Sequence, residues 1–304
     1  MTSYLARRVL QAIVVVLLVT LIVFGLIRLA PGGASADVLG AGSVHQQFLG
    51  EYFTWLGRVL HGNLGQAAGQ NQSVGGLLVV SLPRTLVLTG ISTLIALAVA
   101  IPVGLLQAVR RNRGTDHLLR GLTLLFYGMP AFVLGSLLIL FFGIDLRLFG
   151  AEAPQAPGIV GVLTDWRDLT LPVLTLTLVT VAIFARYMRS AALDSLGQEY
   201  VEAARARGAG QRRVLATHVL RNSLVPLVTL VGLSLPQIFG GALVVESLFN
   251  MRGMGWQLWW AAQNHDFPVT LGFTLVIAVA AAVGSLLADL TYALLDPRVR
   301  YAQQ

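Results

Sequence analysis

The stretch that decides the fold is residues 85–109, TLVLTGISTLIALAVAIPVGLLQAV, which contains no aspartate, glutamate or arginine. About 20 apolar residues in helical form cross the roughly 30 Å hydrocarbon layer of a membrane. A single segment crosses lipid only as a helix, because a helix satisfies its backbone hydrogen bonds internally. The stretch therefore predicts a membrane-spanning helix.

Five other stretches share this pattern and are also predicted to span the membrane: Val9–Ile27, Gly121–Ile144, Leu169–Ala185, Asn222–Val245 and Phe267–Ala288. The fourth span in chain order, Leu169–Ala185, is short, but Arg186 and Arg189 behind it can snorkel to the membrane surface. The first stretch could instead be a cleaved signal peptide. Its length and the lack of a clean small-residue cleavage site favour an uncleaved helix.

Composition supports a bilayer as the main solvent. The chain has 304 residues, of which 56% are hydrophobic and only 12% charged, whereas a soluble domain carries about 25% charged residues. We therefore predict an all-α polytopic membrane protein with six transmembrane helices in one domain, residues 1–304. Within it we assign 9–29 to the first helix, 31–84 to an extracytoplasmic loop, and 85–296 to a five-helix core that includes a cytoplasmic segment at 195–220.

The arginines predict the orientation of the spans. All 21 basic residues are arginine, and fifteen of them fall on segments that share one side of the membrane. Cytoplasmic loops of membrane proteins carry the excess of basic residues. Both termini and residues 186–221 are therefore expected in the cytoplasm. This distribution also accounts for the net charge of +7 without any nucleic-acid partner.

Two aromatic groups lie outside the predicted spans. In the first outer loop, apolar side chains recur at helical intervals: Phe48, Tyr52, Trp55, Leu56, Val59 and Leu60. They predict an amphipathic helix lying on the membrane surface, with a ledge for an external partner as the alternative. Trp256, Trp259 and Trp260 fit an aromatic belt at the membrane interface better than a substrate gate.

The segment between the fourth and fifth spans is charged and helix-forming. Ser195 and Gln198 have the spacing of a capping box, which predicts a helix starting at Leu196. Acidic residues come first in this helix and basic residues last, as the helix dipole prefers: Glu199 and Glu202, then Arg205 and Arg207. Glu202 and Arg205 are spaced to form an i,i+3 pair.

Gly208 follows where a left-handed C-terminal cap is needed, and a second helical stretch is expected at Gln211–Leu220. Ala203, Ala204 and Ala206 leave a flat surface that another protein could approach closely. From the residues alone, a docking surface and an ordinary solvated basic loop are equally good interpretations.

Several function classes are excluded or disfavoured. The chain has no lysine, so it cannot supply the phosphate-binding lysine of a P-loop. The spans contain no Asp, Glu or His, which disfavours a proton-coupled carrier, although sodium sites built from carbonyls stay open. No protease motif or cysteine metal site is present. Pro102, Pro130 and Pro236 are expected to act as tolerated kinks in their helices, with a gating role as the alternative.

The segment Glu202-Ala-Ala-x3-Gly208, followed by His218-Val-Leu-Arg-Asn222, resembles the EAA loop of binding-protein-dependent ABC importer permeases. The resemblance covers nearly the whole chain and points to the dipeptide, oligopeptide and nickel permease group. It is carried by these further motifs: Leu5–Arg8 with Arg28–Gly32, Trp55–Gly65, Leu82–Leu86, Ile101–Gly104, Glu246–Asn250 and Asp296–Tyr301. Met251–Gly255 departs from it, since the group usually has Pro before the first Gly.

The resemblance implies a type I importer permease of the bacterial plasma membrane that translocates short peptides. It implies four kinds of partner: a second homologous permease, two cytoplasmic ABC ATPase subunits or domains, an extracytoplasmic binding protein, and membrane lipid. ATP and Mg²⁺ would bind the ATPases, and no cofactor or metal would bind this chain, which would not itself be an enzyme. The coupling residues would be Glu199, Glu202, Ala203, Ala204, Arg205 and Gly208. Alternatives are a standalone secondary carrier or channel, or, within the ABC group, glutathione or nickel-chelate cargo.

The arginine distribution yields a direct prediction of topology. A single cysteine introduced at Gln303 of this cysteine-free chain should stay unlabelled by an impermeant thiol reagent in intact cells. The same cysteine should react once the cells are permeabilised. Labelling in intact cells would place the C-terminus outside and reverse the predicted orientation.

Overall fold

The computed structural model of the chain describes residues 2–29 and 44–295. The Asp296–Tyr301 motif, the Ala30–Gly32 part of the first motif and Gln303 lie outside the described residues. Within the described part the secondary structure is helical, apart from one isolated bridge between Gln66 and Ser73. The predicted all-α fold class is thereby confirmed.

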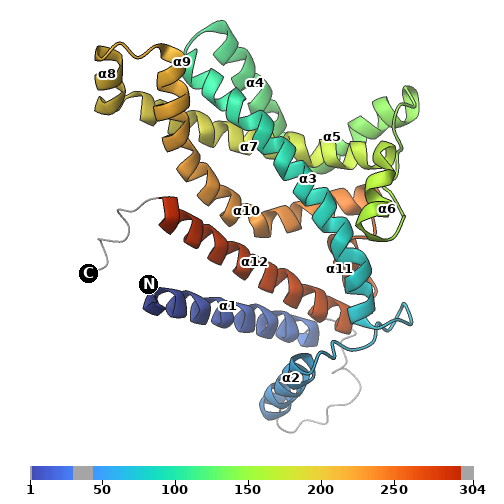
Figure 1. Cartoon of the computed structure of the whole chain (residues 1–304). Helices are drawn as coiled ribbons and strands as arrows, with labels where there is room; N and C mark the ends of the chain where they lie inside the picture. The colour runs from blue at the N-terminus through green and yellow to red at the C-terminus, as the bar shows by residue number, and fades with distance from the viewer. Residues whose placement is uncertain (1, 30–43, 296–304) are drawn as a thin grey trace.

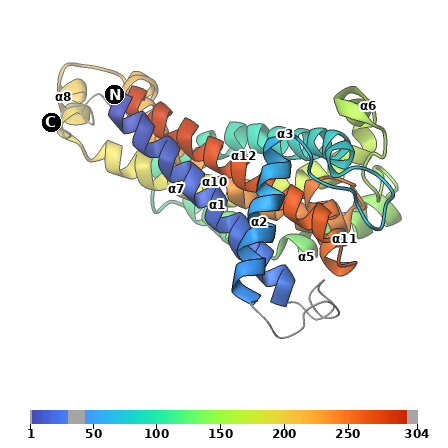
Figure 2. The same ribbon diagram turned by 90° about the horizontal axis from the view of Figure 1, so that it is seen from below.

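Three helix pairs form the principal contacts of the bundle (Figures 1 and 2). α3 and α7 pack along each other, and α12 packs between α10 and α1. In order, the elements are α1 Thr2–Leu29, α2 Val44–Leu60, α3 Val74–Val109, α4 Gly114–Gly128, α5 Ala131–Leu138, the π-helical η1 Ile139–Asp145, α6 Gly158–Thr164, α7 Trp166–Leu196, α8 Glu199–Ala206, α9 Gln211–Arg213, the π-helical η2 Val214–Val219, α10 Leu220–Leu248, α11 Met254–Gln263 and α12 Phe267–Leu295.

Five helices of the described part are long and apolar enough to cross a membrane, and a bent helix pair makes six if it is counted as one span. The helices extend beyond the predicted charge-free stretches. α3 begins at Val74 rather than at Thr85, so its first turns belong to the region predicted as loop. α7 runs from Trp166 to Leu196 and includes Arg186 and Arg189. The prediction ended each span at the nearest charged residue. In the structure Arg84, Arg186 and Arg189 lie within helices, where each contacts a partner.

The prediction of one continuous third span is wrong. Gly114–Gly128 and Ala131–Asp145 are bent by 104° relative to each other. The break lies at Met129 and Pro130, and Met129 has extended backbone angles of φ −86° and ψ 122°. Proline disfavours helical geometry at the preceding residue and removes a backbone donor. Pro130 therefore breaks the helix rather than kinking it mildly, whereas Pro102 lies inside the unbroken α3.

The two arginines predicted to snorkel from the fourth span instead contact α4. Arg189 donates to both carboxylate oxygens of Asp116 at 3.2 and 3.1 Å, and the Asp116 side chain is fully buried. The Arg186 guanidinium lies 4.3 Å from the centre of the Tyr127 ring. A buried carboxylate is stable only when it is paired and hydrogen-bonded. These contacts therefore fix α4 on the C-terminal half of α7.

α3 and α7 approach each other closely because their contact surface is built from small residues. A Cβ atom added to Gly104 would lie 2.7 Å from the Ala185 carbonyl oxygen and 2.7 Å from Met188 Cβ. Nearby, the Ser92 hydroxyl donates to the Val173 carbonyl at 3.2 Å. Small residues allow such backbone proximity, and hydroxyl groups add hydrogen bonds between membrane helices. The pair therefore forms the most extensive helix–helix contact of the described residues.

Helices α3, α10 and α11 meet at a buried carboxylate, Glu246. Its oxygens accept hydrogen bonds from the Thr85 hydroxyl and from the backbone N–H groups of Gly255 (2.8 Å) and Trp256 (3.0 Å). The Met254 N–H donates to the Thr85 hydroxyl at 2.7 Å. The first N–H groups of a helix have no partners within the helix and favour negative charge. Glu246 and Thr85 thus cap α11 from two other helices.

This capping predicts a loss of stability when the carboxylate is removed. Glu246→Ala should destabilise the protein by about 3 kcal/mol, because two helix N–H groups and one hydroxyl lose their buried acceptor. The measurement is thermal unfolding of the purified chain in detergent. Glu152→Ala is the matched control, because Glu152 is exposed on the loop between η1 and α6. Equal melting temperatures for the two variants would contradict the capping role.

Candidate functional site

The candidate coupling surface is α8 and the turn that follows it, but α8 does not begin as predicted. α7 continues through Leu196, and the Ser195 side chain is buried in its last turn, where its hydroxyl accepts a hydrogen bond from the Ser223 hydroxyl at 3.2 Å. Gln198, with φ −88° and ψ 147°, precedes α8 without a side-chain cap. The predicted capping box is therefore wrong, because Ser195 binds a neighbouring helix instead of the start of α8.

The end of α8 agrees with the prediction. Gly208 has φ +81°, a backbone conformation that glycine adopts without steric cost. The Gly208 N–H donates to the Arg205 carbonyl at 2.9 Å, and the Ala209 N–H donates to the Ala204 carbonyl at 3.1 Å. These two bonds form a Schellman motif. The motif fixes the direction in which the chain leaves α8 and enters α9.

α8 has a buried face and an exposed face. Val201 and Ala204 are buried against the C-terminal ends of α3 and α7, where they pack with Ala108, Ala192, Val214 and Val219. Glu199, Glu202, Ala203 and Arg205 are exposed, as is Gly208. Ala204 thus lies on the permease side, so the flat outward surface is formed by Ala203 and Ala206 instead of all three alanines. The small Ala204 lets α8 lie close to the bundle.

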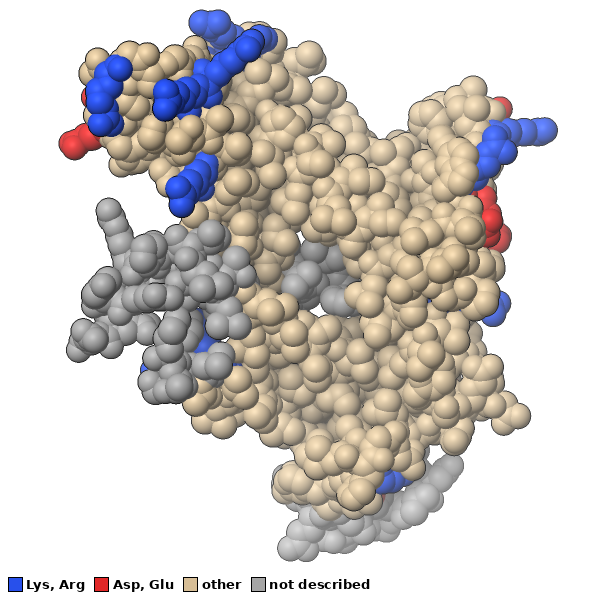
Figure 3. All heavy atoms as spheres, viewed as in Figure 1, with Lys and Arg blue, Asp and Glu red and all other residues tan. Residues whose placement is uncertain are grey.

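The exposed face presents charges to solvent. The Arg207 Nε group donates to the Ala203 carbonyl at 3.3 Å. Among the described residues, no ion pair joins Glu202 to Arg205, so the predicted i,i+3 pair does not form. Figure 3 shows arginines gathered over this end of the molecule, and the exposed ones on α8, α9 and the turn between them are Arg205, Arg207, Arg212 and Arg213. The charges are left available for a partner.

The sequence did not reveal the π-helical segment that connects the coupling surface to the bundle. The predicted stretch Gln211–Leu220 is helical, but η2 occupies Val214–Val219 within it. The His218 ring lies 6.3 Å from the Tyr200 ring, so η2 contacts α8 directly. π-Helical segments occur frequently at functional sites. Nothing in the residue pattern distinguishes them from ordinary helix.

A chemical reaction centre is not what this surface provides. It combines small side chains, exposed charges of both signs and a Schellman turn, on a helix whose opposite face is buried against the bundle. Such a surface suits docking of another protein, which can approach the helix backbone closely at Ala203 and Ala206. The predicted coupling residues lie together on α8 and its C-terminal turn, as the sequence suggested. Ala204 is the exception in orientation, because it is buried instead of facing outward.

The comparisons with known proteins agree with this architecture. Residues 100–301 match the family described as binding-protein-dependent transport system inner membrane component. The chain is 34% identical to a putative peptide permease protein of Brucella ovis, with 99% of each chain covered. It is 33% identical to the oligopeptide transport system permease protein AppB of Bacillus subtilis, covering 99% of this chain and 100% of that one.

A solved structure shows the same fold. The inward-facing MetNI methionine ABC transporter matches with a TM-score of 0.60 and 19% identity, covering 73% of this chain and 97% of that chain. The family match extends over the α8 segment and most of the bundle, and the two permeases align with the chain along almost its full length. The chain therefore belongs to the family of binding-protein-dependent transport system inner membrane components.

Proposed function

We propose that the chain is the permease subunit of an ATP-driven importer of short peptides, with α8 as the element that receives the motion of the ATPase. The observation that carries the proposal is the two-sided character of α8. Val201 and Ala204 bury one face of α8 in a cluster shared with η2, α3 and α7, while its charged face and a Schellman turn are exposed. Peptide cargo is supported by the two similar permeases, which are named for peptide transport. Glutathione and nickel chelates are the alternative cargoes.

The proposal requires partners for the steps that this chain does not perform. Without lysine the chain lacks a P-loop lysine, so ATP and Mg²⁺ are assigned to two cytoplasmic ATPase subunits or domains. A second, homologous permease would complete the translocation path, and an extracytoplasmic protein would deliver the peptide. A standalone carrier is less well supported, because the predicted spans themselves contain no Asp, Glu or His.

The proposed orientation places α8 and both termini in the cytoplasm of the bacterium. The N-terminal end of α1 and α8 lie at the same end of the molecule, and α6 and α11 lie at the other (Figure 2). The excess of arginine falls on the α8 side. Both observations support a single cytoplasmic face that carries the ATPase contact.

Force applied to α8 would reach the membrane through packed side chains. Val201 and Ala204 belong to a buried cluster with residues of α3, α7 and η2, and α8 packs directly on η2. α3 and α7 are themselves in close backbone contact at Gly104. Closely packed interiors have low compressibility and transmit strain. A displacement of α8 would thus tilt α3 and α7 together, which is how we propose the path alternates between its two openings.

Gly208→Val tests this coupling in the reconstituted complete transporter. A β-branched side chain at φ +81° costs about 1–2 kcal/mol, which should redirect the turn and lower peptide uptake per ATP hydrolysed. Gly210→Val is the matched control, because Gly210 has φ −63° and a Cβ atom at either position meets no atom within 4 Å. The valine is thus tolerated at 210 and strained at 208.

The outcomes distinguish a coupling role of α8 from a role in folding. Equal uptake and hydrolysis for both variants would reduce α8 to a solvated loop. Loss of the subunit from the membrane in Gly208→Val alone would indicate a folding role. The wild-type chain reconstituted without ATPase partners should show no concentrative uptake. Uptake in that sample would contradict the importer proposal and support the carrier alternative.

A further inference from the structure

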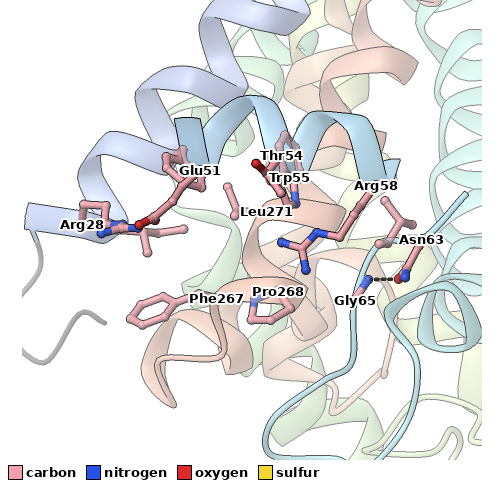
Figure 4. Close-up of a pocket in the computed structure, with 13 residues that line it drawn as sticks. Arg28, Glu51, Thr54, Trp55, Arg58, Asn63, Gly65, Phe267, Pro268 and Leu271 are labelled. Carbon is pink, nitrogen blue, oxygen red and sulfur yellow. Dashed lines mark hydrogen bonds and ion pairs between the residues drawn. The ribbon is translucent and has the colours of Figure 1, made fainter. Parts of the chain in front are cut away.

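A cavity of about 410 Å³ lies between α1, α2 and the start of α12 (Figure 4). The face of α2 predicted to be apolar forms one wall, since Tyr52 and Trp55 are buried against Phe24 of α1 and Leu271 of α12. Leu60, predicted on the same face, is instead 79% exposed. α2 is therefore held on the bundle by its inner face, and the cavity is a half-open hollow between this face and the start of α12.

Two hydrogen-bond donors belong to residues that line the cavity, Trp55 and Arg58. Trp55 is only 6% exposed, and its indole N–H has no hydrogen-bond acceptor among the described residues. Figure 4 shows the Arg58 guanidinium extending from α2 into the space above Pro268. In the part of the chain that the structure describes, none of the ion pairs involves Arg58. A buried donor without an acceptor is unfavourable, so the cavity is arranged to receive an acceptor from outside the chain.

The charge of the cavity favours an anion. Within residues 2–29 and 44–295, its only acidic lining residue is Glu51, and Glu51 forms an ion pair with Arg28. Glu51 balances the charge of Arg28, so the positive charge of Arg58 is not balanced by any acidic residue of the lining. Guanidinium groups bind phosphate strongly because their planar N–H donors match its oxygens. A phosphate group beside Arg58 would also bring an oxygen within reach of the Trp55 side of the cavity.

Apart from Thr54 and Asn63, the remaining side chains of the lining are apolar. Phe24 and Ile27 of α1 and Phe267, Pro268 and Leu271 of α12 line the cavity. These residues belong to the ends of two helices that are apolar enough to span a membrane, so the cavity lies where hydrocarbon meets the polar surface. A free inorganic anion would leave these walls without a partner, whereas an amphiphile would contact both the walls and the donors.

We propose that this cavity binds a membrane phospholipid, with Arg58 and the Trp55 N–H holding the lipid phosphate. The parts of the acyl chains nearest the lipid headgroup lie against Phe24 and Ile27, at the membrane surface closest to α2. The bound lipid then acts as a wedge between α2 and α12 and holds the outer end of α1 in place. This assignment does not depend on which cargo the permease carries.

The test uses membranes that contain the assembled transporter and a photoactivatable phosphatidylglycerol. After illumination, mass spectrometry should locate lipid adducts on peptides of α2 and the start of α12. Arg58→Gln should lower this labelling about tenfold, since a charge-assisted hydrogen bond is lost. Trp55→Phe, which keeps an aromatic side chain of smaller size but removes the N–H, should lower it about threefold. Arg167→Gln is the control, because Arg167 is an exposed arginine of α7 outside the cavity.

Three results would overturn the proposal. Labelling that is unchanged in both Arg58→Gln and Trp55→Phe would show that the donors do not hold the lipid. Equal loss of labelling in Arg167→Gln would reveal only a general attraction to positive charge. Inorganic phosphate and unlabelled phosphatidylglycerol are each added as competitors of the photolabelling. If both reduce the labelling at the same concentration, the site binds free phosphate and the apolar walls contribute nothing. Transporter yield, measured in parallel, shows whether each variant assembles.

Discussion

The close approach of α3 and α7 is the constraint on which the rest of the structure depends. Gly104 meets the backbone of α7 so closely that even a methyl group would contact the Ala185 carbonyl. Alanines such as Ala96, Ala100 and Ala185 continue this small-residue surface and are fully buried. Lipid offers no hydrophobic driving force between helices, so packing and interhelical hydrogen bonds hold them together. The shape of these two helices therefore decides how their neighbours attach.

Each end of this pair carries a distinct attachment. At the outer end, Thr85 of α3 joins Glu246 of α10 in capping α11. At the inner end, Ala108 of α3 packs with Val201 and Ala204 of α8. A displacement of α8 would thus act on the same helix that caps α11 through Thr85. This continuity gives a physical route from α8 at one end of α3 to α11 toward its other end.

The sequence predicted the features that depend on local chemistry. The apolar spans follow from the thickness of the bilayer, and Gly208 was expected at positive φ because a helix must end before α9. What it missed depends on contacts between distant residues. Ser195 has the correct spacing for a cap but binds Ser223, and Asp116 is buried because Arg189 lies opposite it.

The charges gave the least reliable guide to helix boundaries. Arg84 is only 6% exposed inside α3, where its guanidinium donates to the Gln155 carbonyl at 2.7 Å. Hydropathy treats such a residue as the edge of a span, because a charge in isolation avoids lipid. The broken helix at Pro130 was missed for the opposite reason: proline is tolerated in many membrane helices, and only the geometry decides between a kink and a break.

The most direct test of the account is whether the exposed face of α8 touches the ATPase. Ala203→Cys in this cysteine-free chain would carry a thiol-linked benzophenone, and the complete transporter would be illuminated. Our account predicts an adduct between residue 203 and the ATPase, with no such adduct from Thr164→Cys, an exposed site at the other end of the molecule. Adducts from residue 203 to lipid or to this chain alone would contradict it.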